Sequence, residues 1–281
     1  MGTEPSPHQV LKRFADPSGM GKINYVFYFR PGITLHDDGL QNLVARLRDC
    51  AAECFTDVPN YQGLTGDPKE LARNVICAAE DESGKILGFC SAVLLKTQVV
   101  GDVLHLGLTC VRPEARRGGL THKLSSKLIT RYLFENAPFS KVWISNLACV
   151  ISSLGNVALY FDEIHPSPFS VKEPSLHHVA IAKEISRKYR GPLAINDDSV
   201  FDEKTFIFRK SVLGTVFQKS GDDVRYHHRD RWITSYYQAI LEFQNGDEAL
   251  QIGSVSLLTL PKYFFRNLKM KFKAKKLLPA N

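Results

Sequence analysis

The hydrophobic positions in the first part of the chain switch between the period of a strand and that of a helix. β-Branched and aromatic residues fill Ile23–Arg30 and are followed by Pro31-Gly32, which predicts a strand that ends there. Apolar residues then recur at helical spacing across His36–Phe55. Two extended patterns, Asn74–Glu80 and Lys85–Lys96, flank a short turn and predict a hairpin.

The same alternation continues over the next eighty residues. Asp102–Val111 is strand-like and ends at Arg112-Pro113, and the spacing of Leu120, Leu124, Leu128 and Tyr132 predicts a helix over 119–135. Residues 141–147 then predict a strand and 151–164 a helix. From residue 23 the order is therefore strand, helix, hairpin, strand, helix, strand, helix, which indicates an α/β chain.

Beyond residue 165 the pattern is less regular. Residues 175–190 are helix-like, 204–219 and 249–260 are extended, and 229–245 fit either state. We therefore divide the chain into a leader at 1–20, a core at 21–168, a C-terminal α/β extension at 169–260 and a basic amphipathic tail at 261–281.

Composition narrows the class of protein. With 44% hydrophobic and 23% charged residues, the chain has the composition of a globular protein. The formal net charge is +7, but seven basic residues lie in 261–281, which contains no acid, so the remainder is neutral. A neutral body disfavours a globally basic nucleic-acid binder, whose charge forms a patch on a folded face.

Other patterns bear on location and metals. No apolar stretch approaches the roughly 20 residues of a membrane span, and the first residues lack a secretory apolar region, so we expect a cytoplasmic protein. The six cysteines form no Cys-x-x-Cys pair, which favours reduced thiols. The pairs His177-His178 and His227-His228 have no Cys or carboxylate at ligand spacing, so we expect no metal site.

The segment with recognisable chemistry lies between the fourth predicted strand and the helix that follows. Its residues are Val111, Arg112, Pro113, Glu114, Ala115, Arg116, Arg117, Gly118, Gly119, Leu120 and Thr121. A glycine-rich turn that opens a helix offers free backbone N–H groups and the positive end of the helix dipole to an anion. The three glycines of a dinucleotide fingerprint and the Gly-Lys-Ser/Thr of a Walker loop are absent. An ordinary strand-to-helix turn with a surface arginine pair remains an alternative.

This segment resembles the acetyl-CoA loop of the GCN5-related N-acetyltransferases (GNAT). The resemblance consists of Val111-x-Pro113 followed by Arg116-x-x-Gly119-x-Thr121, with Thr121 in place of the usual small residue. It covers about residues 23–165, where the predicted order of elements is also that of the GNAT core. The fold it implies is a mixed, mostly antiparallel sheet flanked by helices.

The resemblance also implies a set of donor contacts. The donor would be acetyl-CoA or a longer acyl-CoA, and no metal would take part. Arg116, Arg117, Gly118, Gly119, Leu120 and Thr121 would hold its pyrophosphate, and backbone groups of Cys110 and Val111 its pantetheine. A strand N–H would polarise the thioester carbonyl. Ser153 stands where the family often has asparagine, with Asn156 nearby, so we expect both to lie along the pantetheine.

Two side chains match catalytic positions of the family. Tyr160, in Ala158-Leu159-Tyr160, would protonate the departing thiolate. His105 stands where many members have a glutamate base, and period-two alternation places it on one face with Gly107, Thr109 and Val111. A histidine has an ordinary pKa of about 6.5, which suits that role. A structural strand histidine and a buried core tyrosine remain alternatives, and His122 is a second candidate base.

The predicted function is transfer of an acyl group from acyl-CoA to a small-molecule or peptide amine, by direct attack in a ternary complex. One alternative is an N-acyl amino acid or acyl-homoserine-lactone type of synthase that takes a long chain from acyl carrier protein. The basic tail could then dock that acidic carrier or an anionic membrane surface, or simply trail a last packed helix. A second alternative is a non-catalytic binding or adaptor protein of the same fold. Neither the acceptor nor the oligomeric state follows from the sequence.

Overall fold

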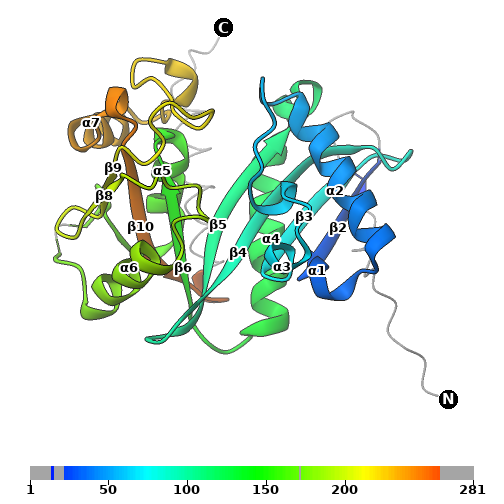
Figure 1. Ribbon diagram of the computed structural model, residues 1–281, viewed down its shortest axis with the longest axis horizontal. Helices are drawn as coiled ribbons and strands as arrows, with labels where there is room; N and C mark the ends of the chain where they lie inside the picture. The colour runs from blue at the N-terminus through cyan, green and yellow to red at the C-terminus, as the bar shows by residue number, and fades with distance from the viewer. Residues whose placement is uncertain (1–13, 16–21, 171, 260–281) are drawn as a thin grey trace, which may run out of the picture.

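A computed structural model describes residues 14–15, 22–170 and 172–259. The basic tail lies outside this range, as does the leader apart from Phe14–Ala15. One mixed sheet forms the centre of the molecule, with the strand order β1-β2-β3-β4-β5-β6-β10-β9-β8 and with β7 pairing to β10 (Figure 1). Helices lie on both of its faces.

The strands are β1 (Phe14–Ala15), β2 (Lys22–Phe29), β3 (Asn74–Glu80), β4 (Ile86–Thr97), β5 (Gly101–Val111), β6 (Val142–Ala148), β7 (Asp162–His165), β8 (Val200–Asp202), β9 (Ile207–Arg209) and β10 (Glu248–Val255). The α-helices are α1 (Pro31–Thr34), α2 (Asp37–Ala52), α3 (Pro68–Leu71), α4 (Leu120–Asn136), α5 (Ile151–Tyr160), α6 (Leu176–Lys188) and α7 (Arg231–Ile240). Short 3-10 turns include η1 (Gln62–Leu64) and η2 (Pro113–Gly118), and two more flank α7: η3 (Val224–Tyr226) and η4 (Phe243–Asn245). The mixed, mostly antiparallel sheet flanked by helices confirms the predicted fold class.

The pairing of β5 with β6 is the one parallel contact between described strands, and it is short. It joins Val103–Leu106 to Trp143–Asn146, while β5 runs on to Val111 and β6 to Ala148. The two strands therefore diverge toward their carboxyl ends. A gap opens in the sheet between these two ends. The helices α4 and α5 begin beside it, because α5 follows closely on β6 and α4 follows β5 after the turn η2.

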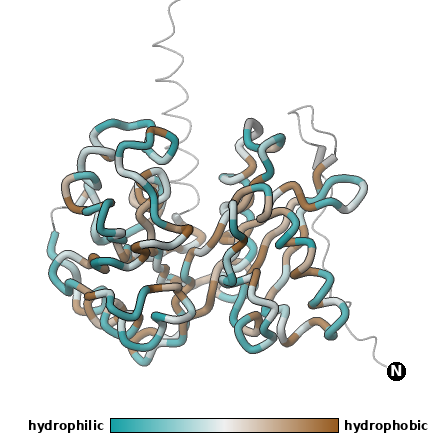
Figure 2. The backbone as a smooth tube through the Cα atoms, turned by 45° about the horizontal axis from the view of Figure 1, so that its top comes forward, coloured by the Kyte–Doolittle hydropathy of each residue, from teal (hydrophilic) through white to brown (hydrophobic). Residues whose placement is uncertain are grey.

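Separate hydrophobic cores fill the two faces of the sheet. Leu104 and Val111 of β5 pack with Leu124 and other residues of α4 and α5 on one face. On the other face one core lies under α2 and a second lies under α6. Figure 2 shows the hydrophobic segments concentrated in the central strands, with hydrophilic stretches in the outer loops.

The segment predicted as a C-terminal extension contributes three strands to the same sheet. β10 pairs antiparallel with β6 over seven residues, from Ala249 opposite Ala148 to Val255 opposite Val142. It therefore lies inside the sheet, between β6 and β9, and not at an edge. Because the start of β10 lies beside the end of β6, the side chain of Glu248 reaches the gap.

Two sequence-based predictions in this part of the chain are wrong. The helix predicted over 151–164 ends at Tyr160, since Asp162–His165 forms β7 and pairs with β10, a contact that local periodicity does not encode. The extended segment predicted over 204–219 contains only the short strand β9, and turns replace the remainder. The ambiguous segment 229–245 contains α7.

A β-bulge in β5 overturns the predicted alternation. Cys90 pairs with Thr109, but Ala92 pairs with Leu106, so Gly107 and Leu108 both lie opposite the single residue between them on β4. The extra residue exchanges the faces of the strand. His105 therefore points to the face opposite Thr109 and Val111, and not to the same face.

Candidate active site

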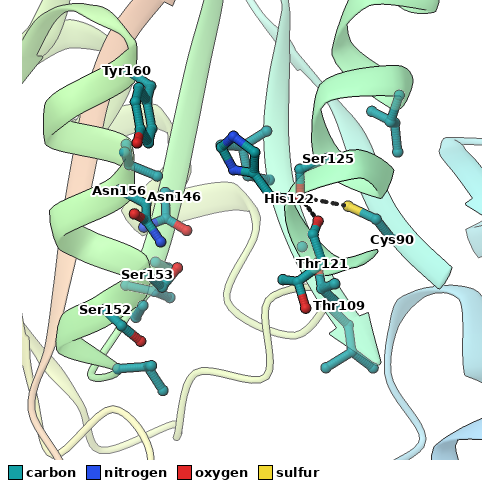
Figure 3. Close-up of a pocket in the computed structure, with 18 of the residues that line it drawn as sticks. Cys90, Thr109, Thr121, His122, Ser125, Asn146, Ser152, Ser153, Asn156 and Tyr160 are labelled. Atoms are coloured by element: carbon teal, nitrogen blue, oxygen red, sulfur yellow. Dashed lines mark hydrogen bonds between the residues drawn. The ribbon is translucent and has the colours of Figure 1, made fainter. Parts of the chain in front are cut away.

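A cavity of about 710 Å³ occupies the gap between the diverging ends of β5 and β6. Residues 106–109 of β5, residues 146–148 of β6 and Cys149 form its edges, and α4 and α5 form two facing walls (Figure 3). The cavity lies where the pairing of the two strands ends, beyond Leu106 and Asn146.

The α4 wall carries the glycine-rich turn. Gly119 adopts φ +66°, a left-handed conformation that favours glycine, and begins α4. Arg116, Gly119 and Thr121 line the cavity, and Nε of Arg116 donates to the carbonyl of Val111 at 3.0 Å. The first N–H groups of α4 have no acceptor within the helix, so the cavity mouth combines a guanidinium with a positive helix end.

The α5 wall carries polar side chains that face α4. Figure 3 shows Ser152, Ser153, Asn156 and Tyr160 along this helix, across the cavity from His122. Nη2 of Arg229 donates to the Tyr160 hydroxyl at 3.5 Å, and the rings of Tyr160 and His122 lie 5.5 Å apart. The structure thus brings Ser153, Asn156 and Tyr160 to the same cavity as Arg116, Gly119 and Thr121.

Three other predicted donor residues have side chains in the hydrophobic cores, and the contacts predicted for Cys110 and Val111 use backbone groups. The side chain of Cys110 packs in the core under α2, whereas Val111 and Leu120 pack in the core under α4. Arg117 and Gly118 belong to the turn η2 that precedes the cavity mouth.

His105 is placed inside the sheet. It is 1% exposed, its Nδ1 shares a hydrogen bond with Oγ of Ser145 at 2.9 Å, and it is not among the described residues of the cavity wall. Burial lowers the pKa of His105 to about 3, so the ring is neutral at physiological pH. The structure gives His105 a bridging position between β5 and β6 and does not bring it to the other candidate residues.

Glu248 is a cavity residue that the sequence analysis missed. Its carboxyl group is buried, and Oγ of Ser211 donates to its Oε2 at 2.6 Å. Burial raises the pKa of Glu248 to about 7, although the Ser211 hydrogen bond opposes this shift. A carboxyl group with such a pKa exchanges protons readily near neutral pH. The one sequence signal is an acid directly before a buried strand, which does not say that the strand borders a cavity.

The side chain of Gln62 fills the bulge on β5. Its Oε1 accepts hydrogen bonds from the Leu108 amide at 3.0 Å and from Oγ of Ser91 at 2.7 Å, and its Nε2 donates to the Tyr61 hydroxyl at 2.7 Å. Gln62 is 4% exposed and has φ +47°. Among the strand N–H groups, that of Leu108 is therefore engaged with Gln62 and is not directed at a ligand.

Replacing Gly107 with alanine tests this arrangement. An added Cβ at Gly107 would lie 1.8 Å from Oε1 of Gln62, so the amide must leave the bulge. We expect a loss of about 1–3 kcal/mol in the free energy of unfolding, measured by urea denaturation. Gly191→Ala, where nothing lies within 4 Å of the added carbon, is the matched control. Equal losses of unfolding free energy in Gly107→Ala and Gly191→Ala would contradict the proposed contact. In a protein that already carries Gln62→Ala, the added Cβ has room, so Gly107→Ala should then cost less; an equal cost would also contradict the contact.

Three further observations concern the described part of the chain. All six cysteines are free. No group of three or more metal-ligating side chains is found among the described residues. No described helix is long and apolar enough to cross a membrane.

Comparison with known proteins adds structural neighbours. No family model and no curated protein matches the sequence. Among solved structures, a putative acetyltransferase of the GNAT family from Desulfovibrio desulfuricans is 10% identical, with a TM-score of 0.32, over 44% of this chain and 73% of that one. ElaA of Escherichia coli is 14% identical, with a TM-score of 0.33, over 52% and 94%. The GNAT family N-acetyltransferase YhbS of Escherichia coli, in complex with CoA, is 14% identical, with a TM-score of 0.24, over 53% and 67%.

At these TM-scores the assignment depends on the topology of the chain itself. A bulged strand leads through a glycine-rich turn into a helix, and that strand pairs in parallel with the next and then diverges from it. This order of elements and this mixed, mostly antiparallel sheet are those that the resemblance to the GCN5-related N-acetyltransferases predicts. The observed cavity occupies the gap between the two diverging strands, and the strands after residue 169 extend the sheet on the β6 side.

Proposed function

We propose that this protein transfers an acyl group from acyl-CoA to a primary amine within a ternary complex. The observation that carries this proposal is one cavity that combines a cationic, glycine-rich helix start with two proton-transfer groups. Arg116 and Gly119 lie at the mouth, Tyr160 on the α5 wall, and Glu248 at the start of β10. A thioester in the gap between β5 and β6 would thus be accessible to both proton-transfer groups.

The donor side supports a phosphate-bearing ligand with a polar, extended arm. Arg116 supplies a charge-assisted donor, and the start of α4 supplies backbone N–H groups for a pyrophosphate. Ser152, Ser153 and Asn156 face α4 along the path from this mouth into the gap. Hydroxyl and amide groups in this position suit the amide-containing pantetheine arm.

The reaction then needs two proton transfers. The amine nitrogen attacks the thioester carbonyl carbon, a C–N bond forms and the C–S bond breaks. The Glu248 carboxylate takes the proton that the nitrogen must lose, and Tyr160 gives a proton to the departing sulfur. The Arg229 guanidinium, which donates to the Tyr160 oxygen, is placed to stabilise that oxygen after it gives up its proton.

Thermal shift with acetyl-CoA, longer acyl-CoAs and free CoA tests the proposal. A ligand at 100 times its Kd stabilises the folded state by about 2.7 kcal/mol, so a clear rise in Tm is expected. Arg116→Met should weaken binding about 10-fold, since a charge-assisted hydrogen bond is lost. Lys183→Met removes the same charge from an exposed ion pair with Glu203 and serves as the control. Absence of stabilisation by every thioester would reject the proposal and favour a non-catalytic adaptor.

A second candidate function follows from the apolar inner end of the cavity. Leu193 and Val212, both almost fully buried, line the cavity beyond the gap. A long acyl chain delivered by CoA or by acyl carrier protein could occupy this end, as in a synthase of N-acyl amino acids or acyl-homoserine lactones. A Tm shift that grows steadily with acyl length would favour this candidate over an acetyltransferase.

A further inference from the structure

The cavity continues through the gap to the face of the sheet that carries α2 and α6. Every second side chain of a strand lies on the same face, so Glu248 shares its face of β10 with Leu250 and Ile252. Both of these residues belong to the core under α6, and Glu248 therefore points to that face. The walls here are mainly apolar or aromatic. We call this region the acceptor chamber and define it by Phe55, Tyr61, Leu193, Val212, Phe217 and Glu248.

Three aromatic rings in the chamber form one cluster. The ring of Phe217 lies 5.2 Å from that of Tyr61 and 6.2 Å from that of Phe55, with interplanar angles of 62° and 78°. Such edge-to-face contacts are favourable. Phe55 and Tyr61 lie in the short connection between α2 and η1, whereas Phe217 comes from the chain between β9 and α7, so tertiary packing brings Phe217 to the other two rings.

Neighbouring contacts hold the rings in place. Sγ of Cys149 donates to the carbonyl of Phe217 at 3.4 Å, and Oγ1 of Thr215 accepts from its amide at 3.2 Å. Nε2 of Gln62 donates to the Tyr61 hydroxyl. All three rings are only partly buried, so they present surface to the chamber.

The chamber has a simple distribution of charge. Burial and the nearby Glu248 carboxylate raise the pKa of Cys149 to about 12 and also raise that of Tyr61, so both groups are neutral near pH 7. Glu248 is the one acid among the described residues of the cavity wall. Lys219 also lines the cavity, and its Nζ donates to the carbonyl of Val216 at 2.7 Å.

This distribution selects among amine acceptors. A substrate with several ammonium groups would bring unpaired positive charge beside Lys219, which is costly in a partly desolvated site. A sugar would find few polar partners on the apolar walls. A single ammonium group pairs with the Glu248 carboxylate, and aromatic faces stabilise a cation close to them. An aromatic ring on the amine would pack edge-to-face or stacked against these three rings.

We infer that the acceptor is a small primary amine that carries one aromatic ring. The ring binds among Phe55, Tyr61 and Phe217, and the amine lies at Glu248. This inference rests on the proposed acyl transfer and assigns the acceptor class of that same site. Phe217, which contacts both other rings and comes from the segment after β9, is the residue that determines specificity.

Steady-state acylation of phenethylamine and of n-hexylamine, two amines with and without a ring, tests the inference. We expect the aromatic amine to have the higher kcat/KM. Phe217→Leu keeps an apolar side chain but removes the ring, and should raise the KM for the aromatic amine about 10-fold with less than a threefold change for n-hexylamine. Phe139→Ala, at a fully exposed ring outside the chamber, is the matched control.

Binding provides a readout that does not require turnover. Thermal shift in the presence of free CoA should show stabilisation by phenethylamine that Phe217→Leu removes and Phe139→Ala retains. Equal use of both amines, or equal effects of Phe217→Leu on both, would overturn the acceptor class while leaving acyl transfer intact. Stabilisation that increases with acyl chain length and is lost in Phe217→Leu would also overturn it, because the acyl chain would then occupy the chamber. Absence of stabilisation by any CoA ligand would instead reject the proposed function.

Discussion

Glu248→Gln is expected to lower kcat about 10²–10³-fold at pH 8, within the usual range for loss of a general base. In the native protein the carboxyl group has a pKa raised by burial to about 7, so kcat should rise with pH up to that value and then level off. The variant should lose this acid limb, since glutamine does not titrate. Titration of the amine acceptor would not produce this limb, because alkylammonium groups have pKa values near 10, well above the pKa of Glu248.

The stability of the same variant provides a control for folding. A raised pKa means that the folded state holds the proton more tightly than the unfolded state, so its contribution to stability is present at low pH and is lost as pH rises through about 7. Glu248→Gln should therefore have a higher Tm relative to the native protein at pH 8 than at pH 5. His105→Gln provides the contrast in mechanism, because its ring is buried outside the described cavity wall. An acid limb that persists in Glu248→Gln and disappears in His105→Gln would assign the base to His105.

Tyr160→Phe is expected to lower kcat about 10²-fold, because the ring remains but the proton donor to sulfur is lost. The KM for acyl-CoA should change less than threefold, since the ring packing against His122 and the polar residues of α5 are retained. The measurement is steady-state release of free thiol. A loss confined to kcat separates proton donation from a purely structural role of this buried ring.

Tyr236→Phe is the matched control for this substitution. It removes the same hydroxyl from a half-buried tyrosine on α7 that is not among the described residues of the cavity wall. Full turnover in Tyr160→Phe would show that the thiolate leaves without this proton. A large rise in KM with unchanged kcat would assign Tyr160 to donor binding.

The sequence predicted most of the elements between residues 22 and 160. Strand and helix periods are local properties, so α2 and α4 were expected within about three residues of their observed ends. The turn that opens α4 was recognised from its two glycines and its arginine pair, and the structure gives Gly119 a left-handed φ of +66°. Tyr160 was recognised from its place in α5, which sits beside the gap because it follows β6 directly.

The errors came from contacts that no local pattern contains. Alternation along β5 fails at Gly107 and Leu108, since one extra residue exchanges the two faces of the strand and separates His105 from Thr109. The helix after β6 ends early because Asp162–His165 pairs with β10, almost ninety residues later in the chain. Neither event changes composition or hydrophobic period enough to be seen in sequence.

The sequence by itself determined most of the order of elements, the glycine-rich turn before α4 and the tyrosine near the end of α5, because each depends on residues close together in the chain. Only the tertiary structure decided which titratable side chain lines the cavity and which rings surround it. Insertion of β10 beside β6 brings Glu248 to the gap, and packing of two distant segments brings Phe217 to Phe55 and Tyr61. Burial raises the pKa of Glu248 and lowers that of His105. Since burial is a property of the whole fold, residue type alone could not distinguish Glu248 from His105 as the proposed proton acceptor.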